Sequence, residues 1–224
     1  MRTATPSDGH ESPDASAFAL VAARLREHGW AELASFAEPC LLAELRADLD
    51  RAEHAGRLRA AGTGSGHAPR RDGTLRGDAI LWLEREASPA QSALLACLDG
   101  WRVALNRELW LGLEEVEAHY ALYPPGAGYA RHRDRFRDDD ARVLSFVLYL
   151  NPDWQTDDGG ELRLHLPDGT LDIAPRLGRA VFFLSAEIEH EVLPAKRERR
   201  SIAGWFRRPS TSRLRRYAQD ERVP

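Results

Sequence analysis

Cysteine is scarce in this chain, and the thiols that are present form no recognisable motif. Only two cysteines occur in 224 residues, Cys40 and Cys97, and they stand alone, without CxxC spacing. Such spacing gives no sign of a disulfide framework. Isolated cysteines of this kind are typical of buried thiols in a reducing compartment. We therefore predict a cytoplasmic protein in which both thiols are buried.

Long apolar runs and an excess of positive charge are also missing. No apolar run approaches the roughly 18 residues that a membrane-spanning helix needs. Residues 1–16 are polar and include three acids, so they lack the apolar centre of a secretory signal and the acid-poor character of a transit peptide. The formal net charge of −4 gives no reason to expect nucleic-acid binding. We expect neither a membrane nor a nucleic acid as a partner.

The first half of the chain has the periodicity of helices. Apolar residues make up 43% of the chain, which is enough for a sizeable core, and here they recur at helical spacing. We predict helices at 17–28, 38–55 and 90–111, short strands at 30–36 and 79–84, a Gly- and Arg-rich loop at 61–74, and a disordered tail at 1–16.

Beyond Glu115 the pattern changes to short β-branched and aromatic segments separated by Gly, Pro and Asp turns. Strands are expected near 116–123, 129–132, 143–150, 160–166, 170–174, 179–184, 189–194 and 199–207. About eight short strands at this spacing favour a barrel or jelly roll. We predict a mainly β protein with helices packed outside the β core, in a single domain that spans 17–224. Its helical part is expected at 17–114 and its jelly-roll core at about 115–207.

A His-x-Asp pair, His132 and Asp134, ends one of the predicted strands, and a further histidine, His190, begins another. Residues i and i+2 of a strand point to the same side, so the pair can face one ion. Two imidazoles and one carboxylate suit Fe(II) and leave three coordination positions open. From the residues alone, a solvated charged loop around His132 and a hydrogen-bonded core histidine at His190 remain alternatives.

The last predicted strand alternates in a way that favours a carboxylate site. Alternation places Arg199, Ser201 and Trp205 on one face of the strand, with Arg200 on the other. An arginine inside a barrel is costly unless it is paired, and a bound carboxylate ligand would pair with it. Tyr149 lies in an apolar strand and needs a partner for its hydroxyl if buried. The alternatives are that the arginines face water and that Tyr149 only fills the core.

Several ordered motifs extend this pattern over more than half the chain, from about Arg76 to Trp205. They are Arg76-Gly-Asp with the strand to Glu84, Tyr123-Pro-Pro-Gly, Tyr129-x-x-His132-x-Asp134, Tyr149-Leu-Asn-Pro-Asp-Trp154, Gly159-Gly-Glu-Leu162, the segment Pro175 to Phe183, His190-Glu-Val-x-Pro194 and Arg199-x-Ser-Ile-Ala-x-Trp-Phe206. Together they resemble the Fe(II)- and 2-oxoglutarate-dependent dioxygenases, in particular the prolyl hydroxylases of the hypoxia-inducible-factor type and their bacterial relatives.

The resemblance implies a double-stranded β-helix, a cupin-like jelly roll with flanking helices. It implies that His132, Asp134 and His190 hold the iron. Arg199 would bind the C5 carboxylate of 2-oxoglutarate with help from Tyr149. Tyr123 would lie near the metal and the substrate entrance. Ser201 takes the second polar position after the arginine, where some relatives have alanine.

The implied reaction is hydroxylation that uses Fe(II), 2-oxoglutarate and O2, with ascorbate as a further candidate cofactor. Succinate and CO2 are the coproducts. The expected partner is a protein or peptide with an exposed proline, and the glycines of 61–74 would allow that loop to move over it. A hydroxylase of a free amino acid or small metabolite is the alternative, and a non-catalytic cupin-like metal-binding or sensor protein is a further one. The sequence does not fix the oligomeric state.

Overall fold

The structure of the protein is a computed structural model that describes residues 15–62, 75–135 and 140–209. Most of the predicted tail 1–16, most of the predicted loop 61–74 and residues 210–224 of the predicted domain lie outside the described residues. The first helix begins at Ala15, two residues before the start predicted for this helix. Ala15 and Ser16 do not interrupt a helix, although the apolar periodicity starts only at Phe18.

The described residues contain three α-helices, each close to its predicted place: α1 (Ala15–His28), α2 (Pro39–His54) and α3 (Pro89–Leu109). Gly29 follows α1 with a φ of 76°, and its N–H donates to the Leu25 carbonyl, as in a glycine-terminated helix. Ser88 is the N-cap of the third helix, and its side chain accepts a hydrogen bond from the Gln91 N–H.

The strands confirm the predicted β-rich second half. They are β1 (Trp30–Leu33), β2 (Arg59–Ala60), β3 (Ala79–Trp82), β4 (Glu115–Tyr123), β5 (Tyr129–His132), β6 (Arg142–Tyr149), β7 (Leu162–Leu166), β8 (Gly169–Ile173), β9 (Ala180–Leu184), β10 (Glu189–Val192) and β11 (Arg199–Arg207), with a 3-10 turn, η1 (Thr156–Asp158). The predicted strands at 30–36 and 79–84 are shorter than expected. The two-residue strand β2 was not predicted, because two residues are too few to show alternation.

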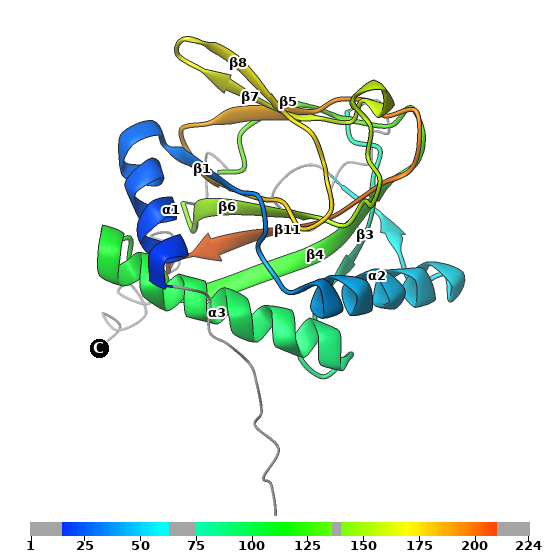
Figure 1. The fold of residues 1–224 in the computed structure, drawn as a ribbon, viewed down its shortest axis with the longest axis horizontal. Helices are drawn as coiled ribbons and strands as arrows, with labels where there is room; N and C mark the ends of the chain where they lie inside the picture. Colours follow the sequence, from blue (N-terminus) through cyan, green and yellow to red (C-terminus); the bar gives the residue numbers. More distant parts are fainter. Residues whose placement is uncertain (1–14, 63–74, 136–139, 210–224) are drawn as a thin grey trace, which may run out of the picture.

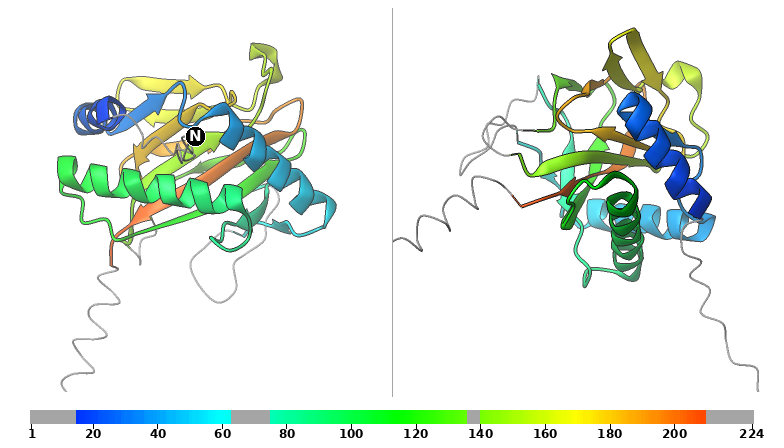
Figure 2. Two further views of the ribbon diagram at one scale, coloured as in Figure 1. Left: turned by 60° about the horizontal axis from the view of Figure 1, so that its bottom comes forward. Right: turned by 90° about the vertical axis from the view of Figure 1, so that its left-hand side faces the viewer.

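Two antiparallel sheets face each other. In the described residues, seven strands form one sheet in the order β1-β9-β6-β11-β4-β3-β2, and four form the other in the order β5-β10-β7-β8. The helices α2 and α3 lie along the outer face of the larger sheet, and α1 packs beside β1 and α3 (Figure 1; Figure 2 shows the same layer from two other sides). The prediction of helices packed outside a β core is confirmed.

Alternation along the central strands divides the apolar residues between two cores. On β11, Ile202 and Phe206 join the core beneath the helices, where Trp101 of α3 is also buried. Tyr149 of β6 and Phe183 of β9 point the other way, into a second core between the sheets. The functional residues considered below line this second core.

Neither cysteine is buried as predicted. Cys40 is exposed and Cys97 is only partly buried. Cys40 lies at the start of α2, off the face that buries Leu42, Leu45 and Leu49, so its position on the helix rather than its residue type decides its exposure. No helix in the described residues is both long and apolar enough to cross a lipid bilayer.

A buried carboxylate joins two helices to the larger sheet. Asp48 of α2 is 3% exposed. It accepts hydrogen bonds from Gln91 Nε2 of α3 (2.6 Å), Tyr120 Oη of β4 (3.0 Å) and Arg51 Nη2 (3.1 Å). Burial raises the pKa of Asp48, but these hydrogen bonds outweigh it and hold the pKa below 3.8. The ionised carboxylate is therefore part of the folded structure at neutral pH.

Replacing Asp48 by alanine is expected to lower the free energy of unfolding by about 2–4 kcal/mol, because buried donors lose their acceptor. Urea unfolding of the purified protein measures the change. In the parent protein this contribution is present above about pH 3.8 and is lost as the pH falls through the lower folded-state pKa of Asp48. Asp50→Ala is the control, since half-exposed Asp50 pairs with Arg200 at the surface and should cost about 1 kcal/mol or less. Equal losses in the two variants would contradict this account of Asp48.

Candidate metal centre

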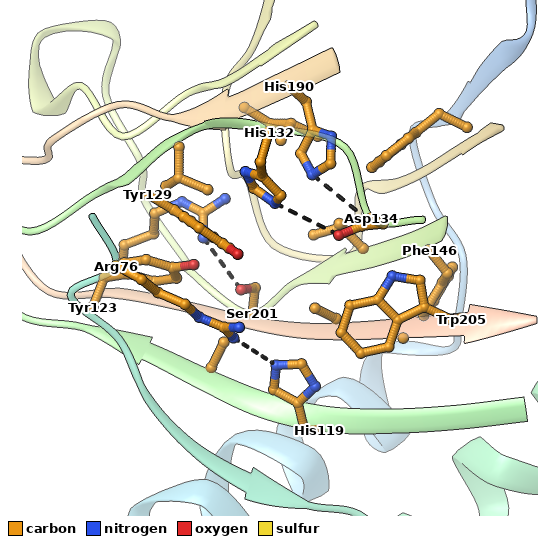
Figure 3. Close-up of a pocket in the computed structure, with 18 residues that line it drawn as sticks. Arg76, His119, Tyr123, Tyr129, His132, Asp134, Phe146, His190, Ser201 and Trp205 are labelled. Carbon is orange, nitrogen blue, oxygen red and sulfur yellow. Dashed lines mark hydrogen bonds and ion pairs between the residues drawn. The ribbon is translucent and has the colours of Figure 1, made fainter. Parts of the chain in front are cut away.

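Three predicted ligands converge at the edge of the smaller sheet. His132 on β5 and His190 on β10 are cross-strand partners, and Asp134 follows β5 by two residues. One ligand atom from each residue lies within 4.8 Å of the others. His132 Nε2 is 3.5 Å from Asp134 Oδ1, and His190 Nε2 is 3.7 Å from Asp134 Oδ2 (Figure 3). The structure thus brings together the three side chains in a group that suits one divalent ion.

Backbone carbonyls set the direction of both imidazoles. Nδ1 of His132 lies 2.7 Å from the carbonyl oxygen of Ala130, and Nδ1 of His190 lies 3.4 Å from that of Ile188. When Nδ1 carries the proton and donates, Nε2 is the free nitrogen, and it faces Asp134. A metal-bound histidine is usually oriented by such a donation from its other nitrogen. Ring packing also holds the orientation of His132, because Tyr129 stacks on it with ring centroids 3.6 Å apart.

Burial and charge give these groups the protonation states that metal ligands need. Burial lowers the pKa of His190 to about 4, although Asp134 opposes the shift, so the imidazole is neutral at pH 7. Burial alone would raise the pKa of Asp134, but nearby His190, His132 and the Ser145 hydroxyl lower it well below its usual range. A neutral imidazole and an ionised carboxylate are the forms that bind a metal.

A buried arginine lines the same pocket as the three ligands. Arg199 is 2% exposed and comes from β11, with its guanidinium carbon 5.2 Å from the ring centroids of both Tyr123 and Tyr149. Its Nε donates to the Gly160 carbonyl (2.8 Å) and its Nη1 to Ser201 Oγ (3.2 Å). The predicted alternation of β11 is confirmed, since Arg199, Ser201 and Trp205 all line the pocket.

Arg199 and the neighbouring Tyr149 together fit a carboxylate. Among the ion pairs of the described residues, none involves Arg199, and the buried Tyr149 hydroxyl has no hydrogen-bond partner there. Burial raises the pKa of Tyr149 to about 12, with Arg199 opposing, so the hydroxyl remains a donor. A guanidinium and a phenol that are both buried and both able to donate suit the far carboxylate of a 2-oxo acid.

Gly160 allows the arginine to reach its place. Its φ is 72°, and a Cβ there would lie 2.9 Å from the Ala195 Cβ and 3.3 Å from Arg199 Cδ. Any larger residue would therefore meet the side chain of Arg199 and disturb a backbone that favours glycine. The Gly159-Gly160 motif of the sequence thus has a physical role beside the arginine.

The pocket has a further wall that includes two residues, Arg76 and His119, to which the sequence analysis gave no place in the site. The cavity is about 520 Å³, counting space open to solvent, and Arg76, His119 and Trp205 line it together with all of the predicted site residues except Tyr149. Arg76 forms a bidentate ion pair with Asp78, in which Nε donates to Oδ1 at 2.7 Å and Nη2 donates to Oδ2 at 2.9 Å. His119 stacks on Trp205 with centroids 5.4 Å apart. Alternation offered a signal for His119, which shares its face of β4 with Ala121 and Tyr123.

Comparison with protein families and solved structures agrees with this geometry. Residues 118–207 match the model of the 2OG-Fe(II) oxygenase superfamily. A prolyl-4-hydroxylase from Pseudomonas putida is 48% identical with a TM-score of 0.79, over 85% of this chain and 98% of that one. A prolyl hydroxylase from Trichoplax adhaerens, solved with a hypoxia-inducible-factor peptide fragment, is 25% identical with a TM-score of 0.80, over 89% of this chain and 92% of that one. These neighbours confirm the expected double-stranded β-helix.

Two human proteins are similar in sequence over part of their length. Egl nine homolog 1 is 34% identical over 59% of this chain and 33% of its own length. Prolyl hydroxylase EGLN3 is 35% identical over 59% of this chain and 59% of its own length. The match therefore spans less than two thirds of either human relative. The ordered motifs, the fold and the near-complete match to the bacterial structure show that the chain belongs to the 2OG-Fe(II) oxygenase superfamily, among the prolyl hydroxylases of the hypoxia-inducible-factor type.

Proposed function

We propose that the protein is a 2-oxoglutarate-dependent dioxygenase that hydroxylates prolyl residues of a protein substrate. Its superfamily requires Fe(II), 2-oxoglutarate and O2. The single observation that carries the proposal is the pairing of two sites in one pocket. The group of His132, Asp134 and His190 and the buried cation Arg199 line the same pocket.

Each residue has a task that its surroundings support. His132, Asp134 and His190 would hold the iron, which supplies the activation of O2 for hydroxylation while 2-oxoglutarate is converted to succinate and CO2. Arg199 would bind the far carboxylate of 2-oxoglutarate with two parallel donors, and Tyr149 would donate to the same group. Ser201 accepts from Arg199 and so holds the guanidinium in place.

The pocket wall supports a role for aromatic residues in excluding water and placing the substrate. Tyr123 is 5% exposed, and its ring centroid lies 5.2 Å from the guanidinium carbon of Arg199. Trp82 is 45% exposed and lies 4.9 Å from the His119 ring and 6.3 Å from Trp205, centroid to centroid. Aromatic surface thus runs from the pocket wall to the solvent, which favours a substrate that extends beyond the pocket, such as a peptide with an exposed proline.

Two further parts of the proposal rest on the sequence. The cytoplasmic location follows from the isolated cysteines, and ascorbate as an added cofactor follows from the family resemblance. A structural metal site without catalysis is disfavoured, because such a site has no use for a buried carboxylate-binding arginine and tyrosine.

Turnover of 2-oxoglutarate tests the proposal directly. Purified protein with Fe(II) and O2 is expected to form succinate, and proline-containing peptides are expected to raise the rate and gain one oxygen atom by mass spectrometry. Free L-proline is the matched comparison. Absence of succinate under all conditions would contradict the dioxygenase assignment. Efficient oxygenation of free proline with inert peptides would instead replace the protein substrate by a small molecule.

A further inference from the structure

Two buried serines form a short hydrogen-bonded chain behind Asp134. Ser145 on β6 and Ser185 just after β9 are 1% and 0% exposed. Ser145 Oγ donates to Asp134 Oδ2 at 2.6 Å, and the two serine hydroxyl oxygens are 2.8 Å apart. Neither serine belongs to the residues assigned above to iron or 2-oxoglutarate. Both reach the metal centre only through Asp134.

The chemistry of the groups fixes the direction of this chain. An ionised carboxylate can only accept, so the Ser145 proton goes to Asp134. Ser145 then has lone pairs left to accept, and Ser185 is the donor to it. A backbone hydrogen bond also links the Asp134 segment to Ser185. The N–H of Arg135, the residue after Asp134, donates to the Ser185 carbonyl at 3.2 Å. Asp134 is thus fixed both at its side chain and at the following peptide, independently of any ion.

The hydrogen bond distinguishes the two carboxylate oxygens. Oδ2 is held by Ser145, whereas Oδ1 lies 3.5 Å from His132 Nε2 and receives no serine hydroxyl. A six-coordinate iron that is bound by three protein atoms would keep three positions open for a bidentate 2-oxo acid and O2. If both carboxylate oxygens bound the metal, only two positions would remain. The number of open positions therefore depends on which oxygens Asp134 can offer.

We propose that Ser145 restricts Asp134 to ligation through one oxygen and so keeps the third open position of the metal free for the cosubstrates. Ser145 is a positioning residue, since it acts through Asp134 and touches neither metal nor substrate. This inference rests on the proposed function, because it takes the three residues as metal ligands.

Binding of 2-oxoglutarate to the Mn(II)-loaded protein provides the test, measured by calorimetry without O2 chemistry. In Ser145→Ala the Oδ2 atom of Asp134 is free to bind the metal. It then has to leave the metal before 2-oxoglutarate can bind as a bidentate ligand. We expect its affinity for the Mn(II)-loaded variant to fall on the order of tenfold, while affinity for Mn(II) alone does not fall. A merely structural role would lower Mn(II) affinity and the melting temperature of the metal-free protein together.

Ser185→Ala is the matched control. It removes a buried serine of the same chain but keeps the bond from Ser145 to Asp134, so its 2-oxoglutarate affinity should stay close to that of the parent. The inference is overturned if Ser145→Ala binds 2-oxoglutarate like the parent, or if Ser185→Ala loses as much affinity as Ser145→Ala. Failure of the Mn(II)-loaded parent to bind 2-oxoglutarate would instead contradict the proposed function.

A crystal structure of the Mn(II)-loaded parent protein is a second test. It needs no variant, so it still decides the question if Ser145→Ala does not fold. Ligation by Oδ1 alone, with Oδ2 still bonded to Ser145, supports the inference. Ligation by both oxygens of Asp134 overturns it.

Discussion

Replacing His190 by alanine is expected to abolish specific binding of divalent metal and, with it, succinate formation. The imidazole is 5% exposed and supplies one of the three ligand atoms of the group. A water molecule in its place would not be held by the sheet in the position of the lost ligand atom. Loss of a ligand should cost more than the roughly 10–100-fold in metal affinity that loss of a supporting residue costs. Calorimetric titration of Mn(II) into the metal-free variant measures the effect, and succinate formation with Fe(II) gives the catalytic readout.

His165→Ala is the matched control for this variant. His165 lies on the neighbouring strand β7, opposite Glu189 of β10, and its Nε2 is 3.0 Å from the carboxylate of Glu191. It is the same residue type on an adjoining strand, outside the metal group. Metal affinity equal to that of the parent is expected. Tight Mn(II) binding by His190→Ala, comparable with His165→Ala, would remove His190 from the metal site.

Arg199→Ala should weaken 2-oxoglutarate binding by about 1.5–3 kcal/mol, the scale of a lost charge-assisted hydrogen bond, while metal binding is kept. The reason is that Arg199 is a buried cation that lines the pocket and pairs with no carboxylate among the described residues. Tyr149→Phe should act in the same direction with a smaller loss, because only one neutral donor disappears. Binding to the Mn(II)-loaded variants is measured by calorimetry.

Arg200 offers a control one residue away. Its side chain leaves the opposite face of β11 and pairs with Asp50 and Glu53 of α2. Arg200→Ala therefore removes an equal charge from the same strand without touching the pocket, and 2-oxoglutarate affinity should not change. If Arg199→Ala keeps the affinity of the parent, or Arg200→Ala loses as much, Arg199 does not bind the cosubstrate.

The parts of the site that the sequence predicted are those with a short-range pattern. His132 and Asp134 are two residues apart at a strand end, and the alternation from Arg199 to Trp205 spans one continuous strand, so both could be placed on one face without knowing any neighbour. The fold class followed in the same way from the change in periodicity near Glu115. Family motifs then connected these separate patterns.

The residues that were missed depend on contacts between strands. Ser145 and Ser185 meet because β6 pairs with β9, and His119 reaches Trp205 because β4 pairs with β11. Strand order and register are set by the packing of the whole core, and a single sequence does not display them. The predicted burial of Cys40 was wrong for a related reason. It was based on residue type, whereas exposure depends on which face of α2 packs against the rest of the protein.

The two faces of β11 also have a consequence for how this chain tolerates change. Ligand-facing and core-facing residues take turns along the strand, so substitutions that alter chemistry and substitutions that alter folding lie one residue apart. A point mutation can explore one property while leaving the other intact. A single-residue insertion before Arg199 has no such freedom, because a shift of register by one exchanges the faces of every side chain. It would point Arg200 into the pocket and Arg199 toward the helices, so the carboxylate-binding side chain and the core side chains would be displaced together.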